Sequence, residues 1–123
     1  WESSVMGALH RLNRTERVAE DPKSQDAWEA ANNAFHFTLV ERCDMPLLLK
    51  MYTSLVSLND RYRHIYLKAA GIQRDVIDEH TAIAEAAVNR EARDACDLLR
   101  AHISKSTANL RRLIADTLPE TLP

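Results

Sequence analysis

Three histidines of this chain stand where an amphipathic helix would turn them toward a protein core. His36 lies in "DAWEAANNAFHFTLVER", one helical turn after Asn32 and one turn before Val40. His80 and His102 also have apolar residues one turn away, on the same face of a helix. Neutral imidazole is the commonest metal ligand. Three histidines and an oxygen donor would hold an ion such as zinc, manganese or nickel and leave a position open for water or a ligand.

A structural role explains each histidine separately. A single histidine on an apolar helix face is usually a hydrogen-bonded core residue, because burying an unpaired polar group costs about 1–3 kcal/mol. The spacing therefore leaves two alternatives open, a shared metal site and separate core histidines. His10 and His64 differ from the other three, since charged residues lie one turn away from each.

Long helices must position these side chains, because the 123 residues include only two glycines and four prolines. We predict an all-α fold, an antiparallel bundle of about five helices. Ser24 is predicted to cap the second helix, Gly71 to end the third and Asn89 to cap the fifth. The five helices are predicted at about 1–13, 25–42, 46–69, 75–88 and 90–116.

The third predicted helix carries one apolar stripe. Large apolar side chains recur along it at spacings of three and four residues, which is typical of one face of an amphipathic helix. The stripe consists of Leu48, Met51, Leu55, Leu58, Tyr62 and Ile65.

The overall charge and apolar content exclude some classes of protein. The formal net charge is −2 and the basic residues are interleaved with acidic ones, whereas a domain that grips nucleic acid shows a basic excess. We therefore expect no direct DNA binding by this segment. No apolar run approaches the roughly 20 residues that span a bilayer, and no signal-peptide pattern is present. Cys43 and Cys96 form no CxxC pair, so we expect a cytoplasmic setting, although two cysteines also allow a disulfide.

The motifs resemble the FCD domain, the ligand-sensing C-terminal domain of FadR-type regulators in the GntR family. The family pattern "D-x-x-F-H", with Asp or Asn first, corresponds to Asn32, Phe35 and His36. A following "N-P-L-L" corresponds to "MPLL", which has Met45 in place of Asn.

Two later motifs extend the resemblance over residues 27–110. "E-H-x-x-I-x-x-A" matches the segment that starts at Glu79, and a helix with Ala and then His seven residues later matches Ala95 and His102. The stretches "WEAANNAFH" and "DRYRHIYL" look most like the CsiR/GlaR branch, whose members sense C5 dicarboxylates or hydroxydicarboxylates.

This resemblance implies an effector-sensing domain of a bacterial transcription regulator, not an enzyme. It implies that a divalent metal, zinc before manganese or nickel, is held by Asn32, His36, His80 and His102. The effector would be a small carboxylate, either a dicarboxylate or a hydroxy acid. The family also implies a homodimer that contacts operator DNA only through an N-terminal winged helix-turn-helix. Because the chain starts at Trp1, we expect residues 1–123 to be a fragment without that domain and without the first bundle helix.

An arginine is the expected partner of the effector carboxylate, because its planar fork meets a carboxylate with two hydrogen bonds. Arg61 and Arg63 flank Tyr62 on the third predicted helix. We prefer Arg63, which lies one turn from Asn59 and could share a polar surface with it. Tyr62 would then line the cavity. The alternative is that both arginines are solvated and the tyrosine belongs to the core.

Two rival functions remain open on the sequence. A metal-dependent hydrolase or transferase could use the histidines to activate water, but no carboxylate is obviously placed beside them as a general base. Glu79 precedes His80 and so points about 100° away from it on a helix. The other rival is a helical dimerisation module with a vestigial site.

Overall fold

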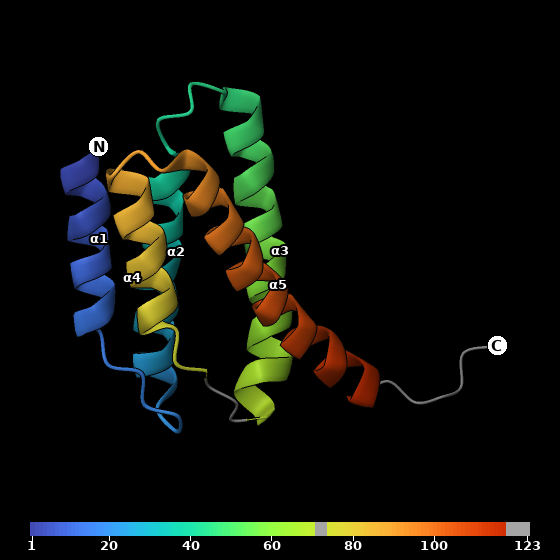
Figure 1. Ribbon diagram of the computed structural model, residues 1–123. Helices are drawn as coiled ribbons and strands as arrows, with labels where there is room; N and C mark the ends of the chain where they lie inside the picture. Colours follow the sequence, from blue (N-terminus) through green and yellow to red (C-terminus); the bar gives the residue numbers. More distant parts are fainter. Residues whose placement is uncertain (71–73, 118–123) are drawn as a thin grey trace.

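The computed structural model describes residues 1–70 and 74–117, and these residues form five helices and no strand (Figure 1). The all-α prediction is confirmed. Three helices, α1, α2 and α4, lie side by side, while α5 packs against α4 and then runs along α3 (Figure 1). The helices are α1 (Glu2–Arg14), α2 (Pro22–Val40), α3 (Pro46–Ala70), α4 (Ile77–Val88) and α5 (Ala92–Thr117).

The start of α2 differs from the prediction. Pro22 occupies its first turn, where a missing N–H costs little. Asp21 caps the helix, and its side chain accepts a hydrogen bond from the Lys23 backbone N–H at 3.0 Å. Ser24, the predicted cap, instead accepts a hydrogen bond from the Val18 N–H at 2.9 Å. Ser24 therefore stabilises the preceding loop rather than the end of the helix.

The turn between α4 and α5 also differs. Asn89 does not cap α5 but ends α4, and its backbone N–H donates to Glu85 O at 3.0 Å. Arg90 follows with φ of 63°, in the left-handed region that often ends a helix. The predicted stop at Gly71 lies outside the described residues.

The hydrophobic core lies between α1, α2 and α4. Phe35 is its centre, with 0% of its surface exposed. At the edge of the core, the Trp1 indole N–H donates to Thr38 O at 2.8 Å and ties α1 to α2. The buried core residues are Val5, Ala8, Leu9, Leu12, Phe35, Ile83 and Ala84.

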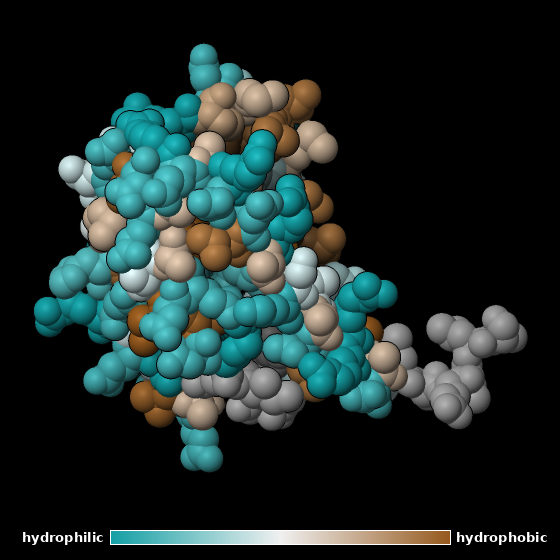
Figure 2. Space-filling view, in the orientation of Figure 1, coloured by the Kyte–Doolittle hydropathy of each residue, from teal (hydrophilic) through white to brown (hydrophobic). Residues whose placement is uncertain are grey.

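The apolar stripe of α3 is a real helix face, but nothing within the described chain covers it. The six side chains of the stripe are between 42% and 64% exposed, and α3 packs mainly against α5. Figure 2 shows hydrophobic surface gathered along the edge of the molecule where α3 lies. Within the described residues, no helix combines the length and the apolar character needed to cross a membrane.

Candidate metal centre

The three predicted histidines converge from three helices: His36 from α2, His80 from α4 and His102 from α5. The ring centroid of His36 lies 5.1 Å from those of His80 and His102, and the latter two are 4.7 Å apart. One ligating nitrogen from each ring lies within 4.8 Å of the other two. The helical spacing left a shared site and separate core histidines open, and the structure brings the three rings together.

The core orients two of the rings. The Phe35 ring packs against the His36 ring at 5.4 Å and against the His80 ring at 5.1 Å. On α4, Ile83 and Ala84 are buried in the core one turn after His80, and this fixes the helix rotation that turns His80 inward. His80 consequently has only 1% of its surface exposed.

The environment keeps the imidazoles neutral. Burial, with smaller effects of His102 and Arg63, lowers the pKa of His36 to about 4. Burial, reinforced by His36 and His102, lowers the pKa of His80 to about 3. Burial also lowers the pKa of His102, although Glu79 opposes this shift. At neutral pH each ring therefore offers a lone pair, the form in which histidine binds metals.

His80 carries an unsatisfied polar atom. Its Nε2 is buried and has no hydrogen-bond partner among the described residues, an arrangement that costs about 1–3 kcal/mol in a protein interior. Two nitrogens on one tetrahedral zinc ion lie about 3.4 Å apart, since each bond is about 2.1 Å long. Ring movements on the order of 1 Å would therefore bring the three histidines onto one ion, and the donor set fits such an ion.

Asn32 is partly buried one turn before His36. It lines the same two cavities as His102 and Arg63. Asn32 therefore borders the space beside the histidines. The set of three imidazoles and one neutral amide suits zinc, nickel or manganese and adds no negative charge to the ion.

A cavity of about 410 Å³ opens beside the histidines, between α2, α3 and α5. A narrower cavity of about 50 Å³ shares part of its lining and adds Arg17 and Arg74. The polar residues of the larger cavity are Asn32, Asn33, His36, Asn59, Asp60, Arg63, His102, Ser106 and Thr107.

The predicted effector residues separate into two pairs. Arg63 and Asn59 line the large cavity. Arg61 is exposed, and Tyr62 stacks on Tyr66 at a ring distance of 6.4 Å. Neither Arg61 nor Tyr62 lines this cavity. The structure thus brings two of the four residues to the histidine cluster.

Arg63 belongs to a charged group that the sequence did not reveal. It pairs with Glu29 at 2.9 Å, and Arg17 pairs with the same carboxylate oxygen at 3.2 Å. Arg17 also stacks over the Trp28 ring at 3.9 Å. Two guanidinium groups on one carboxylate carry one net positive charge, which ionised Asp60 on the wall of the larger cavity offsets. Because the partners lie on the loop before α2, on α2 and on α3, no single-helix pattern indicated them.

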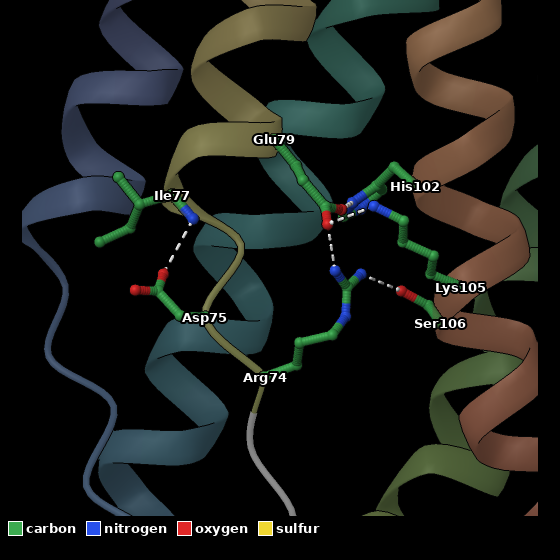
Figure 3. Close-up of polar contacts among 7 residues, drawn as sticks. All are labelled: Arg74, Asp75, Ile77, Glu79, His102, Lys105 and Ser106. Atoms are coloured by element: carbon green, nitrogen blue, oxygen red, sulfur yellow. Dashed lines mark hydrogen bonds and ion pairs between the residues drawn. The ribbon is translucent and has the colours of Figure 1, made fainter.

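Glu79 is a further residue of the centre, and the sequence analysis did not identify its partner (Figure 3). The sequence showed no carboxylate obviously placed beside the histidines as a general base, yet Glu79 Oε2 lies 2.7 Å from His102 Nδ1. Its Oε1 accepts hydrogen bonds from Arg74 and, at 3.2 Å, from Lys105. Burial alone would raise the pKa of Glu79, but the hydrogen bonds from Arg74, His102 and Lys105 outweigh it and lower the pKa to about 2. Because the Glu79 side chain points away from His80 around the axis of α4, its carboxylate lies toward α5.

Known proteins match this chain over most of its length. Residues 4–105 match the FCD domain family. The uncharacterized HTH-type transcriptional regulator BphR of Paraburkholderia xenovorans (strain LB400) is 32% identical over 91% of this chain and 46% of its own length. The HTH-type transcriptional repressor GlaR of Escherichia coli (strain K12) is 30% identical over 84% of this chain and 49% of its own length. No solved structure matches.

The chain spans about half the length of these curated relatives. Both relatives are transcriptional regulators rather than enzymes, which confirms the prediction of a regulatory rather than a catalytic domain. The family match covers the three histidines and Asn32, and with it the resemblance drawn from the motifs is confirmed: the chain belongs to the FCD domain family.

Proposed function

We propose that this chain is the effector-sensing domain of a bacterial transcription regulator. Asn32, His36, His80 and His102 would hold one divalent metal ion, with zinc before manganese or nickel. The ion would offer an open coordination position to a small carboxylate, a dicarboxylate or a hydroxy acid, in the adjoining cavity. The observation that carries this proposal is the convergence of three neutral histidines from three helices, two of which, His36 and His102, line a cavity that Arg63 also lines.

A bound metal ion would make the cavity favourable for an anion. The four proposed ligands are neutral, so an ion bound there would keep its full positive charge. The Arg17–Glu29–Arg63 group carries one net positive charge, and ionised Asp60 on the same cavity wall offsets it, so the ion would supply the positive charge that attracts a carboxylate. An Arg63 guanidinium that already faces the cavity can meet a carboxylate with two hydrogen bonds. Asn59 lies one turn away on the same wall and would accept or donate to a second polar group.

The link to DNA rests on the relatives. Both are described as HTH-type regulators and are about twice as long as this chain, which supports a DNA-binding domain outside residues 1–123. Effector binding would shift the population between two domain arrangements, which requires a different affinity for each. A homodimer would match the two-fold symmetry of helix-turn-helix operators. Such a regulator would act in the cytoplasm, on DNA contacted by the attached domain alone.

The first test is metal content by ICP-MS on protein purified without a His-tag, compared with the His80→Ala variant. About one metal per chain in the parent, lost in the variant, is the expected result. Small dicarboxylates and hydroxy acids are then screened by thermal shift on the metal-loaded protein, where a bound acid stabilises the fold by mass action. No metal after reconstitution with zinc, manganese and nickel would overturn the metal-anchored proposal.

A further inference from the structure

His102 is held at one of its two ring nitrogens. Its Nδ1 lies 2.7 Å from Glu79 Oε2, and an ionised carboxylate can only accept hydrogen bonds. The neutral His102 ring must therefore carry its proton on Nδ1, which leaves the lone pair on Nε2. A ring held in this tautomer has one atom free to ligate, and a carboxylate on the other nitrogen also raises ligand basicity.

Glu79 is in turn held by two cations. Arg74, just before α4, donates through Nη1 to Glu79 Oε1, and its Nη2 donates to Ser106 Oγ at 3.2 Å. Lys105 on α5 donates to the same Glu79 oxygen at 3.2 Å. Figure 3 shows the carboxylate reaching from α4 between these groups and His102. Glu79 Oε1 thus accepts hydrogen bonds from both cations, and Glu79 Oε2 remains for His102.

The neighbouring acid of the same helix turn makes none of these contacts. Asp78 is exposed and lies at the start of α4 next to Glu79. Both carboxylates are equally placed to interact with the helix dipole. The contacts with His102, Arg74 and Lys105 therefore distinguish Glu79 from Asp78.

We infer that Glu79 is a positioning residue of the histidine centre: it fixes His102 in the Nδ1–H tautomer with Nε2 free to ligate, and Arg74 and Lys105 fix Glu79. This inference rests on the proposed function, because it assigns a role toward the metal. It adds a residue that touches neither the ion nor the effector. Through Arg74 and Lys105, the loop before α4 and helix α5 also help to position Glu79.

The test compares Glu79→Ala with Asp78→Ala in the full 123-residue chain, because each variant loses one carboxylate from the same turn of α4. Zinc affinity is measured by competition with a chromophoric chelator. Glu79→Ala is expected to weaken zinc binding about 10- to 100-fold, and Asp78→Ala is expected to leave it within about threefold. Equal affinities in the parent and Glu79→Ala would overturn the inference while leaving the metal site itself intact.

A second readout does not need the metal. Long-range ¹H–¹⁵N correlation spectra of the metal-free parent are expected to show His102 as the Nδ1–H tautomer, and Glu79→Ala is expected to move it toward a tautomer mixture. An Nε2–H tautomer in the parent would overturn the inference, whether or not zinc binds. If the parent binds no zinc but keeps the Nδ1–H tautomer, the proposed function fails, and with it the role of Glu79 toward a metal.

Glu79→Gln serves if the alanine variant does not fold. Glutamine keeps the size and an acceptor oxygen but loses the charge that Arg74 and Lys105 hold. We expect zinc binding about 10-fold weaker than in the parent. Parent-like zinc affinity in this variant would also overturn the inference, because an amide can donate as well as accept and so would not fix the His102 tautomer.

Discussion

Replacing His80 by leucine should stabilise the metal-free protein while abolishing the proposed metal site. His80 is 1% exposed, packs against Phe35 and leaves Nε2 buried without a partner among the described residues. Removing this unsatisfied atom is worth about 1–3 kcal/mol. Fitting a leucine of different shape into the space costs less than about 1.5 kcal/mol. The expected net change is therefore about 1 kcal/mol of added stability, or a rise in Tm of about 3–5 °C for a chain of this size.

The same substitution should have the opposite effect when zinc is present. The parent would gain about 2.7 kcal/mol at a free zinc concentration one hundred times its Kd, whereas the variant would gain nothing. Thermal unfolding followed by circular dichroism, once with EDTA and once with zinc, should therefore reverse the order of the two proteins. His64→Leu is the matched control, because His64 is exposed on α3 and the same chemical change should shift neither curve.

A leucine variant that is clearly less stable than the parent in EDTA would refute this reasoning. It would mean that the His80 ring is satisfied in solution, and that its burial reflects an ordinary core histidine. The two alternatives left open by the sequence spacing are thereby separated by one pair of melting curves. A parent melting curve that is the same in zinc as in EDTA would refute the metal-binding role in the same experiment.

Three further outcomes are expected. In metal-free protein, His36 and His80 stay neutral when folded but take up protons below about pH 6.5 when unfolded. The unfolding free energy should therefore fall as the pH drops from 6.5 toward 4, and denaturant titrations should show a shallower fall for His36→Gln. Arg63→Ala should weaken the binding of a carboxylate effector by about 1.5–3 kcal/mol. Arg61→Ala, on the exposed face, should leave this binding free energy unchanged. Isothermal titration calorimetry measures the binding free energy of both variants. Phe35→Ala should cost about 3–5 kcal/mol of stability in a urea titration, because the ring is fully buried between α1, α2 and α4.

The sequence predicted the histidine cluster because helical periodicity tells which face of a helix a residue occupies. His36, His80 and His102 each stand among apolar neighbours at spacings of three and four residues, which favours core-facing positions that can meet when the helices pack. The side chains of Phe35 and Ile83, buried in the core, then fix the rotation of α2 and α4. Fold class and metal candidates therefore follow from local patterns.

Contacts between helices could not be predicted in this way. Glu79 was assigned by its angle to His80 alone, and periodicity does not say that α5 lies where this carboxylate points. Arg17 reaches Glu29 from a loop that carries no periodic signal. Arg61 and Arg63 differ by two residues, or about 200° of helix rotation, but only the positions of α2 and α5 decide which of them borders the cavity.

The apolar stripe of α3 shows the same limit. A spacing of three and four residues is identical for a face covered within one chain and for a face left uncovered. Leu55 fits the stripe as well as any core leucine, yet it is 64% exposed. The pattern therefore predicted the face correctly but carried no information about its environment.

The three histidines come from α2, α4 and α5, whereas α3 contributes only a wall of the cavity. In terms of hydrogen exchange, an ion on the three rings would join those three helices into one cooperative opening unit, since opening any of them would break the site. The amides of α3, which packs mainly against α5, would exchange through a separate opening of lower free energy. A ligand that touches both Arg63 and the histidine centre would couple α3 to the other three helices. Effector binding would then slow amide hydrogen exchange along α3, with little change in the rest of the domain.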